Sequence, residues 1–265
     1  MGQADAAKPA SPTGEPASPT AESASTTGEP DSPTGESAST TEEPPLPSAA
    51  ARFVRDEHLS ADYAPGRQIA LTLTIAAAIA ALGGALASRA RATDWILMPV
   101  FFVVANFIEW MVHRNPMHRP LTPRIMYRNH AQLHHLAFTD QNMPITGARD
   151  LGLVMMPWYT MIGLFVVASP VMLLAGFLRG PGLAGIFLLA AVAYFLMYEA
   201  LHALYHLSDA TLDRAGIGRL PAFRRRQAHH RRHHVLGRMA HVNFNVTFPW
   251  MDWIFRTTEK PGKPV

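Results

Sequence analysis

Hydrophobic and polar positions divide the chain into a polar N-terminal tract, four long apolar stretches and polar segments rich in histidine. A helix needs roughly 20 apolar residues to cross the hydrocarbon of a bilayer, and each stretch approaches or exceeds that length. The stretches cover about Ile69–Ala87, Trp95–Val112, the interior of Leu151–Leu178, and Leu183–Leu207. We expect Pro157 and Pro170 to trim or kink the third, which is longer than one straight span. The helical core of a soluble protein is the alternative, but four such stretches argue against it.

The polar tract, residues 1–49, consists largely of seven-residue repeats rich in Pro, Ser, Thr and Glu, from Ala10 to Pro44. A coiled coil also repeats every seven residues, but this tract lacks the apolar positions that a coiled coil requires. It cannot bury enough apolar surface to become ordered, and it lacks the basic start and apolar core of a signal peptide. We therefore expect a disordered tail before a membrane domain at residues 50–265. A docking or phosphorylated tail is the alternative.

Charge is divided unevenly between the tail and the rest of the chain. The tail has eight acidic residues against one lysine, so the net charge of +3 understates how basic the membrane domain is. Basic charge beside apolar segments favours a membrane surface over nucleic acid as the partner. The chain has no cysteine, which excludes disulfides, Cys-ligated iron–sulfur clusters and Cys-based zinc sites. Any metal must therefore be held by nitrogen and oxygen.

Basic residues also predict how the spans are oriented. With four spans, both termini share a side with the loop between the second and third spans. The arginines on that side are Arg52, Arg55, Arg67, Arg114, Arg119, Arg124, Arg128, Arg149 and a run from Arg214 to Arg256, against Arg89, Arg91 and Arg179 opposite. Because cytoplasmic loops are enriched in Lys and Arg, we expect both termini to be cytoplasmic. This topology places every clustered histidine on the same, cytoplasmic side.

Twelve of the 13 histidines fall in tight groups that follow the apolar segments, and only His58 stands apart, as expected of a surface residue. In order, the groups are HRNPMH at 113–118, HAQLHH at 130–135, HALYH at 202–206 and HHRRHH at 229–234, with His241 shortly after. Imidazole is the commonest metal ligand in proteins, so this density predicts a metal site. Protonated together, so many imidazoles would repel one another, and metal binding removes that repulsion.

Helical spacing brings many of these side chains onto shared faces. The sets expected to share a face are Glu199 with His202 and His206, His130 with His134, and His230 with His233 and His234. His113 and His118 are five apart, which does not return to the same face of an α-helix. We expect the second span to end near His113, because Pro116 disfavours helix at Asn115, and a turn to bring His118 back. Glu109, one turn before His113, is expected to accept a hydrogen bond from its ring.

The number of histidines bears on the number of metals. Ten of them have good spacing, whereas one metal takes at most about six ligands. Two metals with roughly five imidazoles each would use all ten and leave open positions for oxygen. Nitrogen ligands suit iron, zinc and copper, and the preference of zinc for four ligands favours iron. The roles of His229 and His241 are left open.

The ordered boxes HRNPMH, HAQLHH, HALYH and HHRRHH resemble the histidine boxes of the fatty acid hydroxylase/sterol desaturase superfamily, which are integral-membrane di-iron oxygenases. Residues 109–114 are similar to the opening of the first box in fatty acid 2-hydroxylases and carotenoid hydroxylases. Residues 243–257 resemble the closing segment of the superfamily, although Arg256 stands where a glycine often precedes the final threonine. The resemblance covers about residues 95–257.

This resemblance implies a fold, a ligand set and a reaction. The fold is all-α, with about four transmembrane helices in two hairpins and a cytoplasmic helical cap that holds both metals. The reaction is hydroxylation of an unactivated C–H bond of a fatty-acyl, sterol-like or carotenoid lipid that enters between the spans, with two iron ions as cofactors and O2 as co-substrate. Desaturation is a close alternative. The implied ligands are His113, His118, His130, His134, His135, His202, His206, His230, His233 and His234.

The expected reaction needs electrons from outside the chain. Oxygen activation needs two external electrons, and the chain has no cysteine for an iron–sulfur cluster and no recognisable haem or flavin module. We therefore expect a separate electron-transfer protein of the ferredoxin or cytochrome type, docked on the basic C-terminal segment.

A membrane metal transporter is the alternative function, but a transporter needs polar ligands along a path within the spans. A zinc peptidase is disfavoured because no His-Glu-x-x-His occurs.

Overall fold

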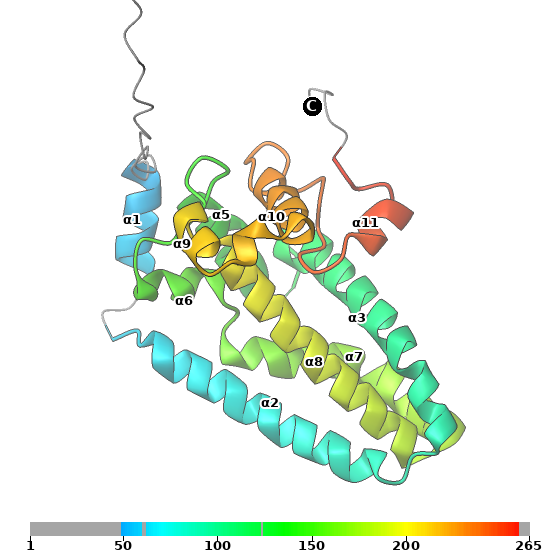
Figure 1. Cartoon of the computed structure of the whole chain (residues 1–265). Coiled ribbons are helices and arrows are strands. Elements are labelled where there is room, and N and C mark those ends of the chain that lie inside the picture. Colours follow the sequence, from blue (N-terminus) through cyan, green and yellow to red (C-terminus); the bar gives the residue numbers. More distant parts are fainter. Residues whose placement is uncertain (1–48, 60–61, 123, 260–265) are drawn as a thin grey trace, which may run out of the picture. The chain divides into compact units, whose positions relative to one another are not determined.

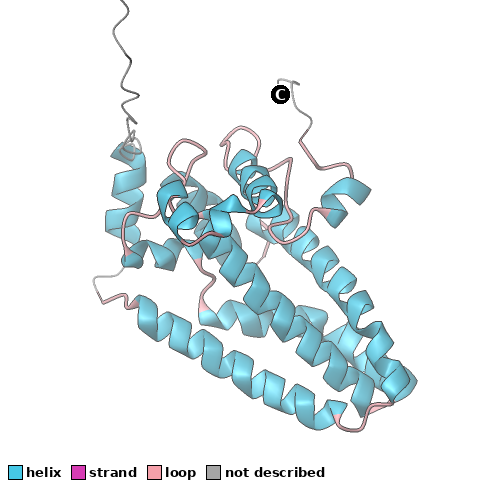
Figure 2. Ribbon diagram, viewed as in Figure 1, coloured by secondary structure: helices cyan, strands magenta, loops and turns pink. Residues whose placement is uncertain are grey.

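The computed structural model describes residues 49–59, 62–122 and 124–259. The tail predicted at residues 1–49 therefore lies outside the described residues, apart from its last residue. All regular structure in the described residues is helical, which confirms the predicted all-α class (Figure 2).

Four helices are long and apolar enough to cross a membrane, as the hydropathy pattern predicts. They are α2 (Pro65–Ala87), α3 (Met98–Val112), α7 (Trp158–Arg179) and α8 (Pro181–Tyr205). The 3-10 turn η1 (Ala92–Leu97) precedes α3, and the π-helical turn η2 (His113–Met117) continues it, so the second candidate span is Ala92–Met117. Pro157 directly precedes α7, whereas Pro170 lies inside it. The first of these prolines therefore trims the third apolar segment, as expected.

The spans α2, α3 and α7 each pack against the fourth span, α8. In Figure 1, α2 leads away from the cap and α3 returns to it, then α7 leads away and α8 returns. Gly180 makes the turn between α7 and α8 with a φ of 90°, which favours glycine, and Pro181 starts α8. Of the α8 span 61% is buried, against 17% of the α2 span, so α8 is the central helix and the others present apolar faces outward. The histidines at the ends of α3 and α8 thus reach the same side.

Close contact between α2 and α8 depends on small residues. A Cβ atom added at Gly185 would lie 2.3 Å from the backbone nitrogen of Ala87 and 2.5 Å from the carbonyl oxygen of Gly83. Small residues allow helix backbones to approach closely in membranes, where van der Waals packing drives helix association.

Replacing Gly185 by leucine should therefore force α2 away from α8. Because overpacking typically costs about 1–3 kcal/mol, we expect a clear fall in the thermal unfolding midpoint in detergent. Gly84→Leu, on α2 where a Cβ meets nothing within 4 Å, is the matched control and should leave the midpoint unchanged. Equal midpoints for the two variants would contradict the packing described here.

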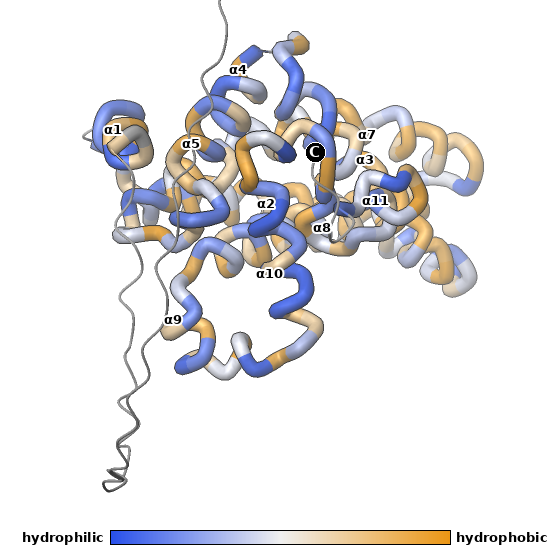
Figure 3. The backbone as a smooth tube through the Cα atoms, turned by 90° about the horizontal axis from the view of Figure 1, so that it is seen from above, coloured by the Kyte–Doolittle hydropathy of each residue, from blue (hydrophilic) through white to orange (hydrophobic). Residues whose placement is uncertain are grey.

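The remaining elements form a helical cap on one side of the spans, and the predicted cap is confirmed (Figure 1). Seen from above, α9 and α10 carry strongly hydrophilic segments (Figure 3). The cap elements are α1 (Ala49–His58), α4 (Arg124–Tyr127), η3 (Arg128–His134), α5 (His135–Ala137), η4 (Ala148–Asp150), α6 (Leu151–Val154), α9 (Asp209–Arg214), η5 (Ile217–Arg219), α10 (Pro221–His233) and α11 (Trp250–Ile254).

Candidate metal centre

The ten histidines expected to bind metal lie in two buried groups of five. We call the first group His113, His118, His130, His135 and His233, and the second group His134, His202, His206, His230 and His234. Within each group, one ring nitrogen of every histidine lies within 4.8 Å of those of the other four. The structure thus brings the ten side chains together in the numbers expected of two metal sites.

Two π-helical turns place four histidines of the first group. His113 and His118 are connected by η2, a wider helical turn than the α-helix, so residues five apart return to one side. The α-helix ends at Val112, so the expectation that it ends near His113 and that a turn brings His118 back is confirmed; the turn is π-helical and contains Pro116. The second turn, η3, has the five-residue bond from the His135 N–H to the His130 carbonyl. Residues His130 and His135 consequently face the same site.

Some histidines that are close in the sequence belong to different groups. His134 had been expected to share a face with His130, but it lies in the second group, because η3 is a π-helix rather than an α-helix. On α10, His233 belongs to the first group whereas His230 and His234 belong to the second. Successive residues of an α-helix point about 100° apart, so α10 lies between the two groups and supplies both. His202 and His206 share the second group, as their spacing predicts.

Backbone carbonyls orient one nitrogen of five of these rings. In the second group, the Nδ1 atoms of His134 and His206 lie 2.8 Å and 2.9 Å from carbonyl oxygens of Leu153 and Met143. The other three pairs are His234 with Phe138, His113 with Phe244, and His233 with Val242. A carbonyl oxygen only accepts, so each Nδ1 must carry the hydrogen and each Nε2 must carry a lone pair.

Those lone pairs converge, which is favourable only with a cation between them. The Nε2 atoms of His134 and His234 are 3.3 Å apart with no hydrogen to share, because both rings donate from Nδ1. Two nitrogens bound at right angles to an ion at about 2.05 Å lie about 2.9 Å apart. The closest Nε2 pairs lie from 2.7 Å apart, for His113 and His130, to 3.3 Å apart, near that value, and all five ligand nitrogens of each group lie within 4.8 Å of one another. Each group therefore fits one metal ion.

Burial keeps the imidazoles outside the spans neutral. It lowers the pKa of His206 to about 4, and burial together with the neighbouring His113 and His134 lowers the pKa of His118 to about 2. Burial also holds the pKa well below the ordinary histidine range for His130, His134, His135, His230, His233 and His234. Neutral rings keep the lone pairs that metal ligation requires.

Glu109 has a different partner from the one its spacing suggested. Its carboxylate accepts hydrogen bonds from the backbone N–H groups of Val246 and Thr247 and from the hydroxyls of Thr247 and Tyr194. The ring of His113 donates instead to Phe244. The expectation that Glu109 orients His113 directly was wrong, because the chain after α10 folds back between them. Glu109 holds this returning segment to α3, and the segment in turn orients the ring.

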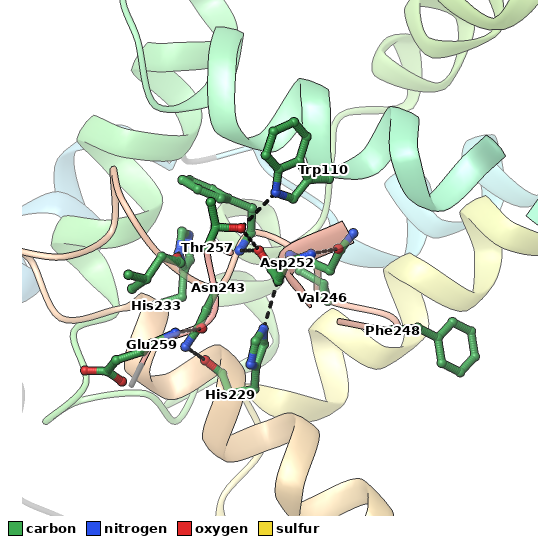
Figure 4. Close-up of polar contacts among 12 residues, drawn as sticks. Trp110, His229, His233, Asn243, Val246, Phe248, Asp252, Thr257 and Glu259 are labelled. Carbon is green, nitrogen blue, oxygen red and sulfur yellow. Dashed lines mark hydrogen bonds and ion pairs between the residues drawn. The ribbon is translucent and has the colours of Figure 1, made fainter. Parts of the chain in front are cut away.

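A second carboxylate, Asp252, also accepts hydrogen bonds from this returning segment (Figure 4). It accepts from the N–H groups of Phe244 and Asn245 at 3.0 Å and 2.9 Å, from the Thr257 hydroxyl at 2.6 Å and from His229 at 3.0 Å. Burial opposes the charge, yet the hydrogen bonds from His229, Thr257 and Asn245 hold the pKa of Asp252 below its ordinary value. His229 is therefore a partner of Asp252 and lies outside both groups.

The two other histidines left aside in the sequence, His241 and His58, are exposed and lie outside both groups. Helical spacing could not predict the role of Asp252, because Phe244 and Asn245 lie across the loop that precedes α11. The one indication in the sequence was that Asp252 lies in the closing segment, seven residues after Asn245.

A cavity of about 780 Å³ adjoins the candidate metal ligands. It is lined by His130, His134 and His202 and also by Leu164 and Val167 of the candidate span α7. A smaller apolar cavity continues between α3, α7 and α8, since Met156, Leu164 and Tyr198 line both. The smaller cavity reaches Phe101 and Phe187 deep in the bundle. This arrangement offers an apolar path from the candidate metal sites to the membrane-spanning helices.

The fold and the site define a helical membrane protein with a histidine-rich metal centre. The model of the family described as fatty acid hydroxylase matches residues 98–257, which is more than half of the chain. The chain belongs to this fatty acid hydroxylase family. Membership indicates an oxidoreductase that acts on lipids by hydroxylation.

The solved structures include one with the same fold. It is described as full-length Scs7p with only the hydroxylase domain visible, and it is 20% identical to this chain with a TM-score of 0.52. The match covers 74% of this chain and 67% of that one. A comparison with curated proteins finds no significant match.

Proposed function

We propose that the chain is a di-iron, O2-dependent monooxygenase that hydroxylates an unactivated C–H bond of a membrane lipid in lipid biosynthesis. The observation that carries the proposal is a largely apolar cavity that histidines of both groups, His130, His134 and His202, help to line. Each group of five imidazoles would hold one iron ion, and nitrogen ligands of this kind suit iron. When bound, iron supplies the oxygen activation and electron transfer that the side chains cannot perform.

The chain's own residues position the substrate and exclude water. Met156, Leu164 and Tyr198 border both cavities, so an extended fatty-acyl, sterol-like or carotenoid chain lying along them would end beside His130 and His134. The apolar lining favours the lipid through the hydrophobic effect and keeps water from the reacting carbon.

The reaction is tested with purified, iron-loaded protein, an electron donor system and candidate lipids. Mass spectrometry with isotopically labelled dioxygen should find a product heavier by one labelled oxygen atom. A product lighter by two hydrogen atoms would identify a desaturase instead. Metal uptake into vesicles with no lipid product would overturn the enzyme and identify a transporter.

Filling the cavity should impair the reaction without removing the metal. Gly163 lines the larger cavity, and a Cβ there meets nothing within 4 Å. Gly163→Phe is expected to raise KM for long-chain lipids about tenfold or more, since roughly 1.4 kcal/mol of apolar contact is a factor of ten. Metal content should stay at the wild-type value.

Gly66→Phe is the control for this substitution, because its Cβ also meets nothing within 4 Å and it lies outside the cavity lining. An unchanged KM in Gly163→Phe would remove the cavity as the lipid site.

The proposed reaction also requires a partner that supplies electrons. We propose a ferredoxin- or cytochrome-type carrier that docks on α10, where Arg225, Arg231 and Arg232 are exposed. Such a cluster would attract an acidic protein and raise its association rate. Repeated turnover by the pure protein without a carrier would contradict this partner.

The arginine distribution supports cytoplasmic termini and a cytoplasmic metal centre. On the opposite side, Arg179 pairs with Asp94 at 3.0 Å, which reduces the effective positive charge there further. Single cysteines introduced at Arg91 and Arg225 test this orientation through their reaction with a membrane-impermeant reagent. Labelling of position 91 alone from the cytoplasmic side would reverse the orientation.

A further inference from the structure

We propose that Arg55, on α1, is a positioning residue for the second group of histidines and thereby for the metal bound there. The inference rests on the metal ligation in the proposed function, but not on the substrate or on oxygen chemistry. Arg55 precedes all four spans and lies outside the family match at 98–257. In the sequence, Arg55 has no evident role beyond that of the other arginines from which the membrane orientation is predicted.

One stretch of chain, which we call the anchoring segment (residues 138–153), orients the second group. Its carbonyl oxygens at Phe138, Met143 and Leu153 accept from His234, His206 and His134. It is also attached through the backbone, since the N–H of Ile145 donates to the His206 carbonyl at 2.8 Å. In the first group, His113 and His233 instead contact the carbonyl oxygens of residues 244 and 242.

Arg55 is the buried cation that holds the anchoring segment in place. Its side chain is 6% exposed and pairs with Asp150 at 3.2 Å. It donates to the carbonyl oxygens of Ala137 at 3.0 Å and Pro144 at 3.4 Å, and its guanidinium lies 4.6 Å from the centre of the Phe138 ring. These contacts run from Ala137, immediately before the segment, to Asp150, which lies three residues before the carbonyl contact of Leu153 with His134.

Asp150 extends this attachment. Its carboxylate also accepts from the Thr146 N–H at 2.7 Å and from the Thr146 hydroxyl at 2.9 Å. Loss of the arginine would leave this carboxylate buried without its cation, which is strongly destabilising to the local structure. The segment would shift, and with it the three carbonyls that set the ring orientations. Removal of such outer partners typically lowers metal affinity about 10–100-fold.

The effect should be confined to one site. The segment that contacts His113 and His233 is held by Glu109 and Asp252, whereas the hydrogen bonds of Arg55 go to residues 137–150. Arg55→Met is therefore expected to weaken metal binding at the second group about 10–100-fold and to leave the first group unchanged. Metal content by mass spectrometry after chelator treatment should fall from two per chain to one.

Matched backgrounds show which metal is lost. Removing His202 and His230 together leaves a chain with the first group alone, and removing His118 and His135 together leaves the second group alone. Arg55→Met should change nothing in the first background and should abolish the remaining metal in the second. The exposed Arg52, on the same helix, supplies the control Arg52→Met, which should retain both metals.

Two further variants guard against simple misfolding. Arg55→Lys keeps the charge beside Asp150 but has fewer donors, so it should bind the second metal with intermediate affinity. Circular dichroism and elution from size exclusion should match the wild type. Loss of both metals, retention of both, or equal loss in the two backgrounds would overturn the role of Arg55. A wild-type chain that binds no metal would overturn the proposed metal centre itself.

Discussion

Replacing His134 by alanine is expected to reduce product formation to background and to release the metal of the second group. The ring of His134 connects several others: its Nε2 lies 3.3 Å from that of His234, and its centroid lies 4.9 Å from His202 and 5.0 Å from His206. It also stacks on His130 of the first group at 5.1 Å and borders the larger cavity. Its loss removes a ligand and opens the site to the cavity.

The measurements are lipid product by mass spectrometry and metal per chain after purification. His241→Ala changes an exposed histidine outside both groups, so it should keep wild-type product and both metals. Wild-type activity in His134→Ala would exclude His134 as a ligand. Two metals bound with no product would assign it to catalysis rather than to ligation.

Replacing Asp252 by asparagine is expected to destabilise the protein and to release the metal of the first group. The carboxylate accepts four hydrogen bonds, from Phe244, Asn245, Thr257 and His229, whereas an amide offers one oxygen and turns two N–H groups toward donors. A buried donor left without an acceptor costs about 1–3 kcal/mol, so two such donors cost about 2–6 kcal/mol. The thermal unfolding midpoint should fall by several degrees.

The loss of metal follows from what the Asp252 network supports. The N–H of Phe244 is held by Asp252, and the carbonyl of Phe244 accepts from His113, so displacement of this residue turns a ligand of the first group. Chelator-resistant metal should fall from two per chain to one, with the second group retained. Asp209→Asn is the control, because the Asp209 side chain is 55% exposed. Selective loss from the second group would contradict this account.

Local sequence patterns predicted the spans well, because the hydropathy of a segment depends only on the residues within it. Each apolar stretch coincides with a helix, and Pro157 marks the start of α7. The histidines that form the candidate metal sites were equally predictable, since their clustering in the sequence does not depend on how the helices pack. The division of the histidines between two groups was only partly predictable from the sequence. His202 and His206 lie at the end of α8, a regular α-helix, as their spacing suggests, but His130, His134 and His135 lie in or beside a π-helical turn, where α-helical spacing does not apply.

The sequence by itself thus determined an all-α membrane protein, two sets of about five imidazoles and their common side of the membrane. Hydropathy and residue type suffice for these, because they depend on the length and composition of short segments. Tertiary structure alone decided which histidine joins which group, and that Asp252 and Arg55 orient them. These roles join residues separated by 8 positions (Asp252 and Phe244) to 96 positions (His234 and Phe138), and their contacts exist only once the returning segments have packed against the helices. The physical reason is that a hydrogen bond depends on positions in space, which periodicity along the chain does not encode.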